Sequence, residues 1–71
     1  MYLVSQDKKN LIKFERVEIS NIFKSHTLTA YGTGSSVWAT VGTYDSEEQA
    51  KAEFARIIAA LENGQTIYEV R

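Results

Sequence analysis

The chain carries one strongly helical stretch, YDSEEQAKAEFARIIAALENG, at residues 44–64. Ser46 stands where an N-cap is expected, and Gln49 follows three residues later, which is the spacing of a capping box. Gly64 closes the stretch, because glycine readily takes the left-handed conformation that follows a last helical turn. The pattern predicts a helix over about residues 47–62.

Apolar residues recur through this stretch with the period of a helix, which predicts the face that is buried. They are Ala50, Phe54, Ile57, Ile58 and Leu61. Side chains of opposite charge stand three or four positions apart, and we expect them on the outer side of the helix. They are Glu47 with Lys51 and Glu53 with Arg56.

The residues before the helix predict β-strands, because short apolar segments alternate with Gly, Asn, Asp and Ser. The candidate strands are residues 2–6, 11–14, 17–24, 27–32 and 37–43, with a closing strand at 66–70 that pairs near the first. Residues 11–24 form either one bent strand or two short ones. We predict a single domain over residues 1–71 with an α+β fold. Its antiparallel sheet of four to five strands is covered on one face by a single helix, in the order β-β-β-β-α-β.

The register of the fourth and fifth candidate strands follows from their alternation. Even positions are apolar in residues 27–32 and odd positions in residues 37–43, so the two apolar sets share a face only across a loop of even length. A four-residue loop sets Leu28 opposite Val41 and Tyr31 opposite Trp38, whereas a two-residue loop sets Thr29 opposite Trp38. Earlier in the chain, the same core face is predicted to hold Val17, Ile19 and Phe23, with a bulge at Asn21.

The opposite face of this sheet has no second helix to cover it, and it carries aromatic and threonine side chains. We predict that a partner protein contacts Thr29, Tyr31, Trp38, Thr40 and Tyr44. The alternative is that the aromatic side chains only pair across the strands and stabilise the sheet. Since 71 residues bury only about 60% of the surface of the unfolded chain, self-association would help such a small domain. The expected partner is a second copy, forming a dimer, or a larger protein.

Catalytic residues are not indicated by the sequence. There is no cysteine, and the one histidine, His26, lies beside Ser25 in a polar segment without a third group to orient it. Asp45, Glu47 and Glu48 stand at a helix N-terminus, where acidic residues cap and complement the dipole. Residues 32–36 (GTGSS) lack the lysine and the following helix of a phosphate-binding loop. We therefore predict no enzyme activity, no cofactor and no metal site.

The formal net charge of −1 argues against a general nucleic-acid binder, although basic residues gather early in the chain. Nucleic-acid binding through Lys8, Lys9, Lys13 and Arg16 is the alternative function. The longest apolar run covers only residues 57–61, far short of the roughly 20 residues of a membrane span. The first residues lack the basic flank of a signal peptide, which favours a cytoplasmic protein without membrane partners.

Three segments carry a resemblance to known proteins. They are MYLVSQD at residues 1–7, AYG at residues 30–32 and VGTYDSEEQAK at residues 41–51. Together they resemble a group of small proteins of Gram-positive bacteria and their phages that has no established activity. The resemblance implies an accessory protein of a phage or mobile element that acts by binding a larger partner, and it transfers no functional residues.

Overall fold

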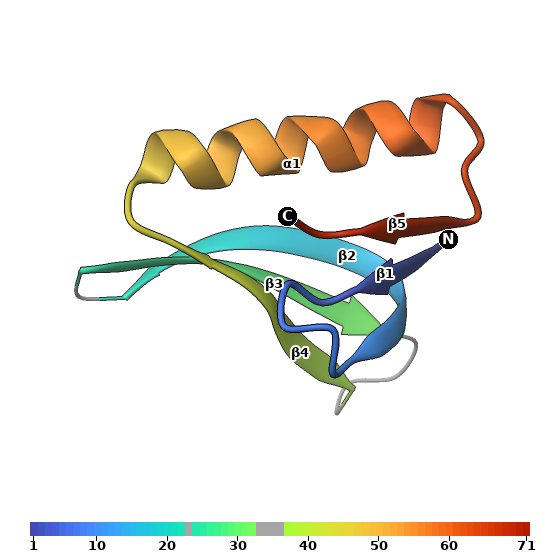
Figure 1. Ribbon diagram of the computed structural model, residues 1–71. Coiled ribbons are helices and arrows are strands. Elements are labelled where there is room, and N and C mark those ends of the chain that lie inside the picture. Colours follow the sequence, from blue (N-terminus) through green and yellow to red (C-terminus); the bar gives the residue numbers. More distant parts are fainter. Residues whose placement is uncertain (23, 33–36) are drawn as a thin grey trace.

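Strand β2 (Leu11–Ile22) is the longest strand and connects the two halves of the sheet in the computed structural model, which describes residues 1–22, 24–32 and 37–71. Its first three residues pair with β1 (Tyr2–Val4), and the remainder pairs with β3 (Ser25–Gly32). β4 (Trp38–Tyr44) and β5 (Ile67–Glu69) complete the order β4-β3-β2-β1-β5. Residues 11–22 are thus one long, curved strand rather than two short ones (Figure 1).

The predicted α+β class and the order β-β-β-β-α-β are confirmed. One pairing differs from the expected antiparallel sheet, because β5 lies parallel to β1 and the sheet is mixed. The parallel direction follows from the connection: the chain leaves β4, crosses the sheet as helix α1 (Glu47–Glu62) and returns as β5 beside β1. The two termini lie close to the helix side of the sheet (Figure 1).

Helix α1 covers one face of the sheet, and its ends are those that the sequence predicts. The Ser46 hydroxyl accepts from the Gln49 N–H at 3.2 Å, and the Gln49 side chain accepts from the Asp45 N–H at 3.1 Å. Gly64 has φ of +71°, the left-handed conformation expected after the last turn. In the described part of the chain, no helix is long and apolar enough to cross a membrane.

The hydrophobic core lies between α1 and the sheet. Its buried members come from all the strands except β5, from the helix and from the C-terminal segment: Leu3, Ile12, Leu28, Ala30, Val41, Ile57 and Val70. Val17 and Ile19 pack against it, as expected, whereas Phe23 lies outside the described residues.

The face that the helix buries agrees only in part with the predicted one. Ala50 and Ile57 are buried and Phe54 packs against the core, as expected, but the helix also buries Glu53 and Ala60. Ile58 and Leu61, which the periodicity places in the core, are 43% and 47% exposed. The helix is therefore turned about its axis from the expected setting. The small Ala50 and Ala60 side chains face the sheet, and Glu53 is buried instead of lying on the outer side.

The register of β3 and β4 agrees with the four-residue loop for its first three pairs. Tyr31 lies opposite Trp38, and the Gly32 N–H donates to the Val37 carbonyl at 2.8 Å, while loop residues 33–36 themselves lie outside the described residues. The register then shifts between Leu28 and Thr29, so that Leu28 faces Gly42 and not Val41. A second irregularity occurs between Phe14 and Arg16, whereas the predicted bulge at Asn21 is absent because Asn21 pairs regularly with His26.

The segment after β1 closes the sheet toward its other edge. The Gln6 N–H donates to the Val41 carbonyl at 2.7 Å, and the Gln6 side-chain oxygen accepts from the Thr43 N–H at 2.9 Å. These bonds occupy backbone groups along part of the β4 edge, which would otherwise be open to pairing with another strand. Among the described residues, neither α1 nor the segment after β1 covers the outer face of the sheet, opposite α1.

Candidate functional site

A groove crosses the outer face of the sheet over β2, β3 and β4, with a volume of about 500 Å³. We call it the outer groove. Its lining residues are Ser20, Ser25, Thr27, Thr29, Tyr31, Trp38 and Thr40. Four of the five residues predicted to contact a partner belong to it, because strict alternation holds along β3 and the first part of β4.

Trp38 is strongly exposed at the outer groove, with 61% of its surface open to solvent. It lies at the start of β4 opposite Tyr31, and the two rings form a cross-strand pair. Thr29 lies deeper, only 7% exposed, on β3 between β2 and β4. An exposed indole beside a groove is the kind of surface from which interface anchors are drawn.

The groove's charged neighbours are already partnered within the chain. The Arg16 guanidinium carbon lies 4.0 Å from the centroid of the Tyr31 ring, and the Tyr31 hydroxyl donates to a Glu18 carboxylate oxygen at 2.7 Å. This hydrogen bond to Glu18 raises the pKa of Tyr31. At the far end, the Thr27 hydroxyl donates to the Ser20 carbonyl at 3.2 Å.

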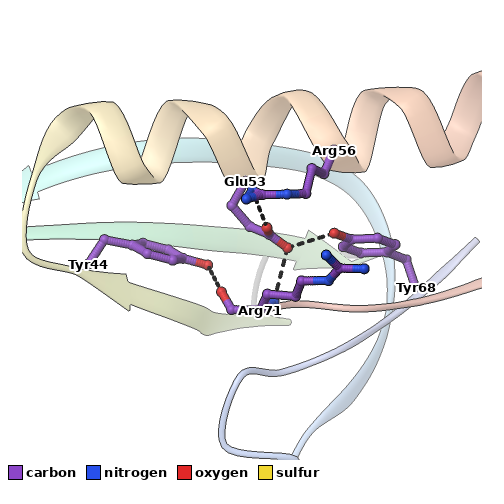
Figure 2. A network of polar contacts seen from close by, with 5 residues as sticks. All are labelled: Tyr44, Glu53, Arg56, Tyr68 and Arg71. Atoms are coloured by element: carbon purple, nitrogen blue, oxygen red, sulfur yellow. Dashed lines mark hydrogen bonds and ion pairs between the residues drawn. The ribbon is translucent and has the colours of Figure 1, made fainter.

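Tyr44, the fifth predicted contact residue, lies on the opposite face, so its assignment to the outer surface is wrong. The irregularity after Thr40 shifts the alternation, and Gly42 and Tyr44 therefore face the helix with Leu28. Figure 2 shows the Tyr44 ring beneath α1, where its hydroxyl donates to the Arg71 carbonyl at 2.8 Å. Burial and the nearby Glu53 carboxylate raise the pKa of Tyr44 to about 12.

The sequence pattern places Glu53 on the outer side of the helix, but the structure buries it. Only 1% of its surface is exposed. One carboxylate oxygen accepts from the Tyr68 hydroxyl at 2.8 Å and from the Arg71 N–H at 2.9 Å. The other accepts from the Arg56 guanidinium at 3.0 Å (Figure 2). These partners satisfy a buried carboxylate, and they fasten α1 to the segment after β5. We interpret this network as structural.

The predicted basic residues lie in the loop after β1 and on β2. Lys8 lies in the turn after β1 and forms an ion pair with Glu69 at 2.8 Å, and this contact raises the pKa of Lys8. Lys13 is on β2 opposite Tyr2, whereas Arg16 lies over the Tyr31 ring beside the outer groove. The ion pair with Glu69 reduces the positive field that Lys8 and Lys9 could offer a phosphate backbone.

His26 lies in β3 rather than in a turn, and its Nδ1 is 2.7 Å from the side-chain oxygen of Asn21. Among the described residues, no group of three or more His, Cys, Asp or Glu side chains could hold a metal ion.

Comparison of the chain with protein-family models, curated proteins and solved structures finds no match. The resemblance to small proteins of Gram-positive bacteria and their phages therefore stays a prediction. The outer groove and its chemistry are the observations on which a function can be argued.

Proposed function

We propose that this protein is a small non-enzymatic interaction module that self-associates and binds protein partners through the outer groove. The observation that supports this most directly is Trp38, an indole 61% exposed at the mouth of a groove on the one sheet face that α1 leaves uncovered. Indole and phenol rings bury a large area with few rotatable bonds, which makes them effective anchors in protein interfaces. A phage or mobile-element accessory role is consistent with this proposal.

The test is the mass of the protein in solution, measured by sedimentation from about 10 µM to about 1 mM, the range of weak interactions. We expect the average mass to rise above 8.0 kDa with concentration, and Trp38→Ala to weaken the association without changing the circular dichroism spectrum. Leu61→Ala is the matched control, because Leu61 is also exposed but lies on α1 at the other face. A mass of 8.0 kDa at every concentration would contradict self-association.

Nucleic-acid binding through Lys8, Lys9, Lys13 and Arg16 is the alternative proposal. Arg16, Tyr31 and Trp38 share the outer face and could stack on unpaired bases. Titration with mixed single-stranded oligonucleotides at low and high salt separates the two functions, because binding to phosphates weakens steeply as salt is added. Salt-sensitive oligonucleotide binding that Trp38→Ala removes would favour this alternative over the protein-binding proposal.

A further inference from the structure

The outer groove is uneven along its length. Tyr31 and Trp38, a directly opposed pair, form what we call the aromatic end. Ser20, Ser25 and Thr27 form the hydroxyl end, where Ser20 lies opposite Thr27. Along β3 the two ends are four to six residues apart, which corresponds to roughly 13–20 Å. Tall rings therefore stand at one end of the groove and short side chains at the other, with Thr29 and Thr40 between them.

We propose that the groove is occupied by the same groove of a second copy, related by a two-fold axis near Thr29 and Thr40. The aromatic end of each chain then packs on the hydroxyl end of the other. This inference rests on the proposed function and specifies its partner and geometry. A two-fold axis brings a surface against itself, so a patch that is high at one end and low at the other is complementary to its own copy.

Electrostatics permit this arrangement at low cost. Arg16 and Glu18 flank the aromatic end as one cation and one anion, and both already contact Tyr31 within the chain. Arg16 and Glu18 together therefore add no excess of like charge to the contact. At the hydroxyl end, the Thr27 hydroxyl keeps its bond to the Ser20 carbonyl, so covering it leaves that donor satisfied.

The structure favours contact through the face over pairing through the β4 edge. The edge groups at Val41 and Thr43 are bonded to Gln6, which shortens the stretch available to a second strand. The face spans three strands, roughly 10 Å, and about 20 Å along β3. A contact of this size buries a few hundred Å² on each copy, less than the roughly 800 Å² per partner of a standard interface, so the dimer is expected to be weak.

The test pairs two variants that damage opposite ends of the groove. Trp38→Ala removes the ring of the aromatic end, and Thr27→Arg fills the hydroxyl end. In the two-fold arrangement each variant alone spoils both contacts of its own dimer. A mixture of the two restores one contact fully: the Trp38 ring of the Thr27→Arg chain meets the intact hydroxyl end of the Trp38→Ala chain. At the other contact, the arginine meets the space left by the missing indole.

We expect each variant alone to weaken dimerisation at least about 10-fold, and an equimolar mixture to recover most of the dimer at the same total concentration. Circular dichroism checks that each variant is folded. Ser25→Arg replaces Thr27→Arg if the latter unfolds, because Ser25 is exposed and lines the same end of the groove. Leu61→Ala serves again as the control that leaves dimerisation unchanged.

The outcomes separate the geometry from the function. If the native protein dimerises and Trp38→Ala does not, but the mixture stays monomeric, then the two-fold arrangement is wrong and the interaction function stands. The arrangement is also wrong if either variant dimerises as well as the native chain. If the native protein is monomeric throughout, then both this inference and self-association in the proposed function are wrong.

Discussion

Glu53 shows how one residue can decide the setting of a helix. A carboxylate is rarely buried unless hydrogen-bond donors surround it, and here three donors from Arg56, Tyr68 and Arg71 converge on its two oxygens. Two of these donors lie 15 and 18 residues further along the chain. The helical pattern around Glu53 contains no sign of them, and it places the residue on the solvent side with Arg56 as a surface pair.

Replacing Glu53 by glutamine tests this network. The amide keeps the size of the side chain, and its oxygen can still accept from the Tyr68 hydroxyl and the Arg71 N–H, which share one oxygen. Its NH2 group then faces the Arg56 guanidinium, donor against donor, and the charge of the Glu53–Arg56 ion pair is lost. We expect Glu53→Gln to lower the free energy of unfolding by about 2–4 kcal/mol in urea denaturation. Glu62→Gln, an exposed substitution in the last turn of α1, should change it by less than about 0.5 kcal/mol. A Glu53→Gln protein as stable as this control would show that the network contributes nothing to stability.

The raised pKa of Tyr44 predicts that the protein loses stability as the pH becomes alkaline. Its pKa is about 12 in the folded protein and about 10 in an unfolded chain. Between these values the unfolded state releases the phenolic proton more readily than the folded state does, so the free energy of unfolding falls as the pH rises. The pKa values of Tyr31 and Tyr68 are raised as well and act in the same direction.

We expect Tyr44→Phe to reduce this loss, because phenylalanine has no proton to release. Urea denaturation at steps from about pH 9 to about pH 12 measures the slope for both proteins. The variant should start less stable, by about 1 kcal/mol for the lost bond to the Arg71 carbonyl, and decline less steeply. Parallel slopes for the two proteins would rule out Tyr44 as a source of the pH dependence.

At the scale of single elements, β4 departs most from what its sequence predicts. Strict alternation places Val41 opposite Leu28 and Tyr44 on the outer face. In the structure, Leu28 pairs with Gly42, and the residues beyond Val41 change faces. A bulge can be recognised from sequence only through hints such as a glycine inside a strand. Gly42 is such a hint, but the alternating apolar and polar residues around it predict a regular strand without a bulge.

The close approach of the Tyr44 ring to Gly42 yields a prediction for this strand. A Cβ atom at Gly42 would lie 2.5 Å from the Tyr44 hydroxyl oxygen and 2.9 Å from two ring carbons. We expect Gly42→Ala to lower the free energy of unfolding by about 1–3 kcal/mol, because the ring must leave its site under α1. In a Tyr44→Ala background the same substitution should cost much less, and a double-mutant cycle measures the difference. An equal cost in both backgrounds would mean that the ring is not the reason.

For helix α1, the sequence predicts the two ends of the element but not its rotation about its own axis. Its bounds, its Ser46 cap and its terminal glycine are all confirmed, because each depends on residues within a few positions of one another. Its rotation depends on the sheet beneath. The larger Ile58 and Leu61 side chains are more than two-fifths exposed, while Ala50 and Ala60 lie against the sheet. Alanine lets the helix approach closely enough for Glu53 to reach Tyr68.

At the scale of the whole molecule, the chain is small for a protein without disulfide bonds, and its core is correspondingly limited. A dimer through the outer groove would add stability by mass action, since association favours the folded state. Stability would then depend on protein concentration, which is not expected of a monomer.

Thermal unfolding measures this dependence. Above the dissociation constant, a tenfold rise in protein concentration should raise the Tm of the native protein by about 3–5 °C. The Tm of Trp38→Ala should not change with concentration, while that of the Leu61→Ala control should rise as for the native chain. A native Tm that is independent of concentration up to about 1 mM would argue against a dimer.

The order of the elements, the bounds of the helix and the uncovered outer face all follow from short-range patterns in the chain, whereas the choice between Tyr31 and Thr29 as the residue opposite Trp38 is made by the structure. These features depend on residues that are neighbours in sequence or on the two-residue period of a strand. The shift in β4, the parallel pairing of β5, the burial of Glu53 and the inward position of Tyr44 depend on contacts between residues far apart in the chain. Such contacts form only when the helix and the sheet pack together, because several local arrangements have similar energies until packing selects one of them.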